Sequence, residues 1–120
     1  MSLKMERKVA IPQGSHKGEI IAARLTTKTF DPIKGPENVV EITIAPAYKV
    51  EGAQTLNVSV IYAPELNGLS GLSKFLERMD IEVPEGQEWD PASLHGRKVA
   101  FTSKTVDGFV RVLKDTIRAE

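Results

Sequence analysis

Basic and aromatic side chains occur together in two turn-rich stretches of the sequence, at residues 28–34 and 104–111. A single strand of nucleic acid is held by cationic groups that follow its phosphates and by flat rings on which its bases stack. An asparagine between the stretches could add a hydrogen bond to a base edge, although an ordinary polar strand face would explain it equally well. The residues predicted to bind nucleic acid are Lys28, Phe30, Lys34, Asn57, Lys104, Phe109 and Arg111.

Charge is distributed unevenly along the chain although the total is zero, with 16 basic and 16 acidic side chains. A neutral total argues against a dedicated duplex-DNA binder. Residues 1–35 carry seven basic and three acidic side chains (net +4), residues 97–118 carry six and two (net +4), and residues 77–90 carry one and six (net −5). If the two basic segments lie together, they form a basic patch. A solvated surface of mixed sign is the alternative.

No arrangement of residues typical of catalysis is present in the sequence. The chain has no cysteine, which excludes thiolate nucleophiles and thiolate metal ligands. Its two histidines, His16 and His95, lie near glycine turns and cannot complete a catalytic zinc site without a carboxylate. The acidic run at 77–90 lies on a polar stretch, where a solvated surface is expected rather than a buried acid–base pair. The sequence therefore predicts a protein that is not an enzyme and needs no cofactor or metal.

Two-residue alternation of apolar side chains predicts strands, because successive side chains of a strand point to opposite faces. In the first strand Ile21, Ala23 and Leu25 fall on one side. Asp107-Gly108 predicts a hairpin turn, since both residues tolerate the left-handed backbone that tight turns need. The predicted strands cover residues 17–29, 39–45, 55–62, 98–104 and 109–118.

The apolar spacing changes to three and four residues between the third and fourth predicted strands. The apolar positions from there on are Leu69, Leu72, Leu76 and Met79, with Phe75 beside them. Steps of three and four mark one face of a helix, which predicts a helix over residues 70–79. Asn67 or Ser70 could begin it, because a short side-chain oxygen can accept a hydrogen bond from an unpaired backbone N–H.

The order strand, strand, strand, helix, strand, strand favours the mainly β class and a five-stranded OB-like Greek-key barrel with one α-helix between strands 3 and 4. Closing five short strands into a barrel removes their exposed edges. A small sandwich or another α+β fold is the alternative. We expect a flexible N-terminal lead-in at 1–13, a single domain at 14–120, and a short helical turn at 91–94.

In such a barrel the expected binding face is the outer face of the second and third strands, framed by two loops. None of its outward residues is aromatic or basic, so the rings and charges must come from the framing loops. The outward residues are predicted to be Glu41, Thr43, Thr55, Asn57 and Ser59.

Three pieces of the chain are similar to a loose group of small OB-fold proteins from phages, prophages and other prokaryotic genomes. The pieces are Gly-Ser-His-Lys-Gly-Glu-Ile at 14–20, Leu-Ser-Lys-Phe-Leu at 72–76 and Leu-His-Gly-Arg-Lys-Val at 94–99. The similarity runs from about Gly14 to Arg118 and rests on glycine at bends and on leucine and phenylalanine in the core. The resemblance implies the OB fold and single-stranded DNA binding, the label usually given to the group, and it brings no catalytic motif.

The functional prediction is a module that binds single-stranded DNA or RNA. An accessory protein-interaction or structural OB module of a phage or replication or repair complex is the alternative. The longest unbroken apolar stretches, such as 20–23 and 60–63, are too short to span a bilayer, and the N-terminus lacks an apolar signal core. We therefore expect a cytoplasmic protein without membrane association; protein partners are possible, and the oligomeric state stays open.

Overall fold

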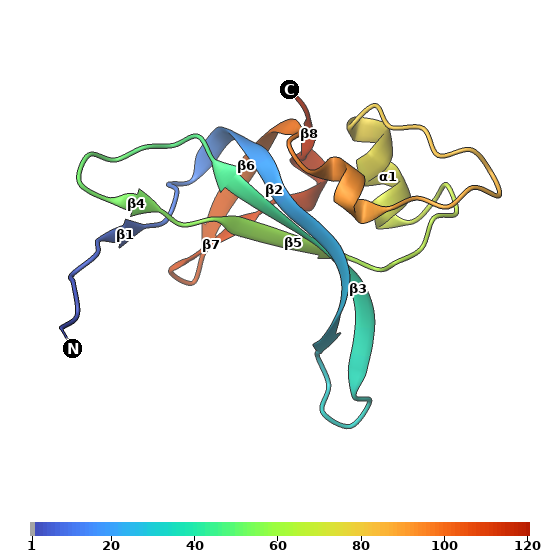
Figure 1. Cartoon of the computed structure of the whole chain (residues 1–120), viewed down its shortest axis with the longest axis horizontal. Coiled ribbons are helices and arrows are strands. Elements are labelled where there is room, and N and C mark those ends of the chain that lie inside the picture. Colours follow the sequence, from blue (N-terminus) through green and yellow to red (C-terminus); the bar gives the residue numbers. More distant parts are fainter. Residues whose placement is uncertain (1) are drawn as a thin grey trace.

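The computed structural model describes residues 2–120; Met1, the first residue of the predicted lead-in, lies outside them. In chain order the elements are β1 (Lys8–Val9), β2 (Gly14–Thr29), β3 (Pro36–Pro46), β4 (Gln54–Thr55), β5 (Val58–Tyr62), α1 (Gly71–Arg78), η1 (Pro91–Leu94), β6 (Lys98–Val106), β7 (Phe109–Val112), η2 (Lys114–Thr116) and β8 (Arg118–Ala119). The described chain is mainly β, with one α-helix (Figure 1). No helix within residues 2–120 has both the length and the apolar character needed to cross a membrane.

β2 organises the main sheet because it pairs with two strands at once. From Gly18 to Thr29 it runs antiparallel to β3, and from Gly14 to Glu19 it runs antiparallel to β6. The strand order is β5-β3-β2-β6-β7, and β8 also pairs with β6. Within residues 2–120 the two outermost strands, β5 and β7, do not pair with each other, so the sheet is open. The predicted mainly β class is confirmed, whereas a closed five-stranded barrel is not.

A β-bulge in β2 changes which of its side chains face the core. The register with β3 shifts between Ile20 and Ala22, so that Ile20 and Ala23 both point inward. The prediction that Ile21, Ala23 and Leu25 fall on one side is therefore wrong at Ile21, which is only half-buried. Leu25 lies on the same side as Ala23, opposite the buried Val40, but is 60% exposed. A bulge adds a residue opposite one residue of the partner strand, which the sequence of β2 alone does not reveal.

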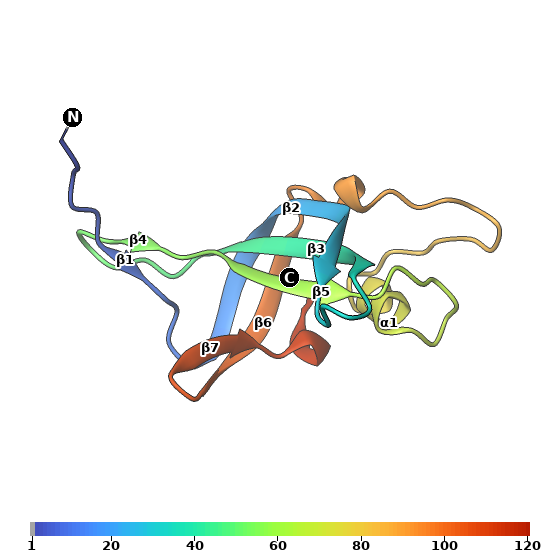
Figure 2. The same cartoon turned by 90° about the horizontal axis from the view of Figure 1, so that it is seen from below.

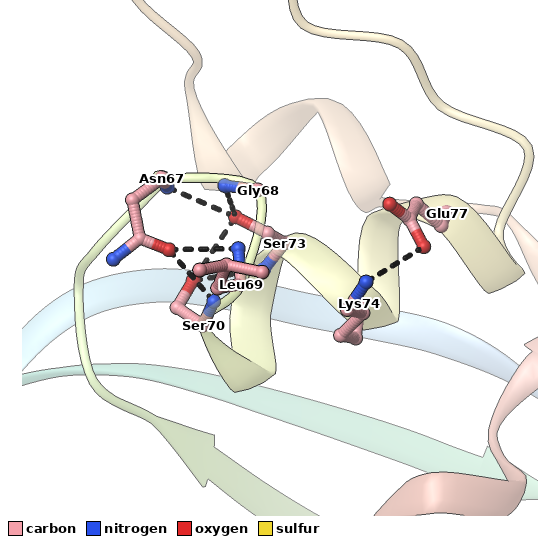
Figure 3. Close-up of polar contacts among 7 residues, drawn as sticks. All are labelled: Asn67, Gly68, Leu69, Ser70, Ser73, Lys74 and Glu77. Carbon is pink, nitrogen blue, oxygen red and sulfur yellow. Dashed lines mark hydrogen bonds and ion pairs between the residues drawn. The ribbon is translucent and has the colours of Figure 1, made fainter.

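The helix α1 lies against the core, and its predicted apolar face is confirmed except at Leu69, which precedes the helix and is 82% exposed. Its buried apolar side chains are Leu72, Phe75 and Leu76. Ser70 is the N-cap, because its Oγ accepts a hydrogen bond from the Ser73 N–H at 3.2 Å. Asn67 Oδ1 accepts from the N–H groups of Leu69 and Ser70 at 2.9 and 2.7 Å (Figure 3). Both expected capping residues therefore take part in starting the helix.

The predicted fifth strand over 109–118 is wrong beyond Val112, where β7 ends. The Leu113 N–H still donates to the Thr102 carbonyl at 2.9 Å, and the chain then turns through η2. Thr116 Oγ1 donates to the Leu113 carbonyl at 2.6 Å and accepts from the Thr102 N–H at 2.9 Å. The Thr116 hydroxyl thus takes the place of a backbone partner for Thr102 on β6. β8 then pairs with the start of β6.

The predicted third strand over 55–62 is divided between two sheets. β4 pairs in parallel with β1 to form a small, separate two-stranded sheet, and β5 begins only at Val58 (Figure 1). Ile11, between β1 and β2, is 1% exposed and belongs to the core. The segment expected to be a flexible lead-in therefore contributes a short strand and a core side chain.

The two predicted turns after the helix are confirmed. Asp107 and Gly108 join β6 to β7 with φ angles of 52° and 81°, the left-handed values that a two-residue hairpin turn requires. Asp90 Oδ1 accepts from the Ala92 N–H at 2.9 Å at the start of η1. Leu94, at the end of η1, is completely buried, so this turn fixes the long connection onto the core.

Candidate nucleic-acid interface

The β6–β7 hairpin has a basic and aromatic outer surface. Lys104 lies directly opposite Arg111, and Val106 lies directly opposite Phe109. All four side chains share one face because residues two apart in a strand point the same way, while Val110 on the other face packs against the core. Phe109 is 71% exposed. The structure therefore brings three predicted binding residues together on one surface, the hairpin face (Lys104, Val106, Phe109 and Arg111).

The hairpin face concentrates positive charge without a partner. Neither Lys104 nor Arg111 forms an ion pair with any residue of 2–120, and both are exposed. Like charges directly opposite each other on antiparallel strands are destabilising. An anion placed between the two side chains would remove this repulsion. The two adjacent positive charges therefore favour binding of a phosphate.

β2 and β3 extend beyond the core as a projecting arm, residues 26–39 (Figure 1). The predicted loop over 29–38 is shorter than expected, since pairing continues to Thr29 and Pro36. Proline is accommodated there as the first residue of a strand. At the tip Phe30 is 58% exposed, and the turn is held by Asp31 Oδ1, which accepts from the Ile33 N–H at 2.9 Å.

The arm and the β6–β7 hairpin lie on the same side of the molecule. In Figure 1 both extend downward from the sheet, and β5 runs between them; Figure 2 shows this side from below. The two predicted basic–aromatic stretches therefore frame one surface, with the outer faces of β3 and β5 between them.

Glu41 on β3 neutralises part of the arm's positive charge. Its carboxylate lies 2.9 Å from Lys28 Nζ and 3.2 Å from Arg24 Nη2. The hydrogen bond from Lys28 is the largest influence and lowers the pKa of Glu41; burial opposes this, and Arg24 lowers the pKa further. Lys28 is therefore held by a carboxylate, whereas Lys34 at the tip forms no ion pair with residues 2–120.

The surface between the two hairpins is small and polar. Glu41 lies opposite Ile61, and Thr43 lies opposite Ser59 with their hydroxyl oxygens 3.2 Å apart. Asn57 is exposed just before β5 begins. The surface has no ring on which a base could stack, as the sequence predicts for these outward positions.

Thr55 does not belong to this surface, so that prediction is wrong. It lies in β4 beside β1, and its hydroxyl donates to the Tyr48 carbonyl at 2.6 Å. The reason is the interruption between β4 and β5, which removes Thr55 from the strand that it was expected to share with Ser59.

Sequence reasoning missed Lys114 as a residue of this region. Its Nζ donates to the Ile61 carbonyl on the free edge of β5 at 2.6 Å and lies 5.1 Å from the centre of the Tyr62 ring. Lys114 connects the segment after β7 to β5 across the opening of the sheet. No pattern in the sequence could have indicated this contact, because it depends on the turn that interrupts the predicted fifth strand.

The other aromatic side chains and His16 take part in packing or in hydrogen bonds to the backbone. Phe75, Phe101 and Tyr62 are buried, and Trp89 packs partly buried against the core. His16 lies 5.9 Å from the Phe101 ring and forms a 2.7 Å hydrogen bond with the Pro12 carbonyl through Nε2. No cluster of potential metal ligands occurs within residues 2–120.

Comparison with known sequences gives no relative for this chain: it matches no protein-family model and no curated protein. Functional inference therefore rests on the geometry described above.

Proposed function

We propose that this protein binds single-stranded nucleic acid across the surface between the arm and the β6–β7 hairpin. The observation that carries the proposal is the hairpin face. There Lys104 and Arg111 lie opposite each other without an ion pair, beside the exposed Phe109. The pair supplies a position for a phosphate, and Phe109 supplies a ring for the adjacent base. Phe30 and Lys34 repeat the combination at the tip of the arm.

We further propose that the fold is an open variant of the OB architecture. Supporting this, the central strand β2 pairs with both β3 and β6, β3 pairs with β5, β6 pairs with β7, and α1 lies between β5 and β6 in the chain. OB folds are partly open five-stranded Greek-key barrels that bind oligonucleotides on one face, between two loops. The resemblance to small phage and prophage OB-fold proteins favours the same interpretation.

The small polar surface suits a strand that is held at its two sides. Short side chains such as Thr43 and Ser59 leave room for bases to approach the sheet, while charge and stacking come from the hairpins. Nothing on this surface provides several fixed donors for one particular base. The proposed binding is therefore weakly dependent on sequence and strongly dependent on salt.

The test is a fluorescence-anisotropy titration of a labelled thymidine oligomer at several salt concentrations. We expect binding that weakens as salt rises, because each phosphate contact releases a counterion. Phe109→Ala should weaken binding by about tenfold or more, since stacking on an aromatic side chain contributes about 1–3 kcal/mol per base. Lys49→Gln, an exposed lysine after β3, is the matched control and should leave affinity nearly unchanged. No binding at high micromolar protein would contradict the proposal.

A second candidate function, protein interaction, is favoured by one specific observation. The arm and the residue before it expose apolar side chains that nothing in residues 2–120 covers: Ile33 in the arm is 95% exposed and Leu25 just before it is 60% exposed. Exposed apolar patches often mark contacts between proteins. Ile33→Ser separates the two candidates, because it removes exposed apolar area without adding a negative charge to the arm: it should weaken self-association measured by light scattering while leaving oligomer affinity within about twofold.

A further inference from the structure

A pocket lies where β5, α1 and the η2 segment meet. It has a volume of about 450 Å³. Basic side chains predominate in its lining, with three cations and one carboxylate. The lining residues are Tyr62, Gly71, Lys74, Arg78, Lys114 and Asp115.

Two of the cations are held in place by neutral groups. Arg78 donates through Nε to the Ile117 carbonyl at 2.8 Å and through Nη2 to the Lys114 carbonyl at 2.9 Å. Lys114 donates to the Ile61 carbonyl. Neither forms an ion pair with any residue of 2–120. Both positive charges are therefore fixed in position yet not neutralised by a carboxylate contact, which favours binding of an anion.

Tyr62, which lines the same pocket, carries an unused hydrogen-bond donor. The residue is 6% exposed, and its hydroxyl is buried without a hydrogen-bond partner among the described residues. Burial raises the pKa of Tyr62 to about 12, so the hydroxyl keeps its proton at neutral pH and can donate it to an acceptor. A buried polar group without a partner is costly, and a ligand oxygen would satisfy it.

From this arrangement we propose that the pocket binds a phosphate group, with Arg78, Lys114 and Lys74 supplying charge and the Tyr62 hydroxyl donating a hydrogen bond. Phosphate is favoured because several oxygens on one small anion can meet donors that come from different directions. The phosphate can be free or can belong to a nucleic-acid strand. Only the second source rests on the proposed function.

The test is a titration of the full chain with inorganic phosphate, followed by ¹H–¹⁵N NMR at constant ionic strength maintained with chloride. We expect saturable shifts of the amides of Gly71, Lys74 and Asp115. Tyr62→Phe removes only a hydroxyl that has no partner, so folding stability should stay equal or rise, while phosphate affinity should fall about tenfold. Lys74→Gln, at an exposed ion pair 3.7 Å from Glu77 (Figure 3), should lower affinity about threefold.

Lys49→Gln, an exposed lysine outside the pocket lining and outside the proposed nucleic-acid interface, is the control and should not change phosphate affinity. Shifts that do not saturate, or equal affinities of Tyr62→Phe and the unmodified chain, would overturn the proposal. A thymidine oligomer distinguishes the sources: it shifts the same amides if the strand supplies the phosphate, and leaves them unshifted if the phosphate is free. Oligomer binding without any response to inorganic phosphate would refute the pocket and leave the proposed function intact.

Discussion

At the scale of single residues, Glu41 lowers the positive charge of the proposed interface. It lies between the two hairpins and holds both Lys28 and Arg24. Its carboxylate thus stabilises the base of the arm while placing a negative charge where a nucleic-acid strand would pass. These two effects are opposed: the ion pairs of Glu41 stabilise the fold, whereas its negative charge weakens the binding of nucleic acid.

Glu41→Gln should therefore lower stability at neutral pH and raise oligomer affinity by about threefold. Because the pKa of Glu41 in the folded state lies below 4.5, its stabilising effect is complete above that pH and is lost as pH falls through the folded-state pKa. Urea unfolding of both proteins at neutral and strongly acidic pH measures this. A stability difference that persists unchanged in acid would contradict the assignment.

At the scale of elements, β2 depends on one glycine. A Cβ at Gly18 would lie 2.7 Å from the Ala45 carbonyl oxygen and 2.7 Å from Ile44 Cγ2, both on the paired strand β3. Only glycine lets the two strands approach this closely just before the bulge at Ile20. The curvature of β2, which allows it to pair with β3 and β6 together, begins in this region.

Gly18→Ala should destabilise the protein by about 2–3 kcal/mol, as expected when extra volume is forced into a close-packed contact. Gly71→Ala is the matched control, because a Cβ there would meet the Tyr62 ring at 3.4 Å, an ordinary contact distance, at the first position of a helix. Chemical denaturation compares the two variants. Equal stabilities would show that β2 and β3 are farther apart than described.

The elements that the sequence predicts correctly are those that local spacing determines. The helix follows from the four- and three-residue spacing of Leu72, Leu76 and Met79, and the β6–β7 turn follows from Asp107-Gly108. The bulge in β2 and the end of β7 at Val112 were missed because both depend on partners distant in sequence. For the same reason the sequence predicted three residues of the hairpin face, Lys104, Phe109 and Arg111, but not the contact of Lys114 with β5.

At the scale of the whole molecule, the open sheet leaves one edge of β5 without a strand partner. The N–H and C=O of one residue point to the same side of a strand, and the Ile61 carbonyl points outward, since it accepts from Lys114. The Ser59 amide points the same way, whereas those of Val60 and Tyr62 point toward β3.

Native-state hydrogen exchange should therefore be at least about tenfold faster at Ser59 and Ile61 than at Val60 and Tyr62. The comparison is internal to one strand, so neighbouring residues serve as the control. Equal protection along β5 would mean that β7 closes the sheet in solution and that the fold is a complete barrel.

The central claim is that one strand of nucleic acid lies between the arm and the hairpin face. ¹H–¹⁵N NMR of the chain during addition of a thymidine oligomer tests it most directly. We predict shifts concentrated at residues 28–35, 57–61 and 103–112, with residues 77–90 unchanged because their net charge of −5 repels the strand. Shifts confined to residues 77–90, or no shifts at saturating oligomer, would contradict it.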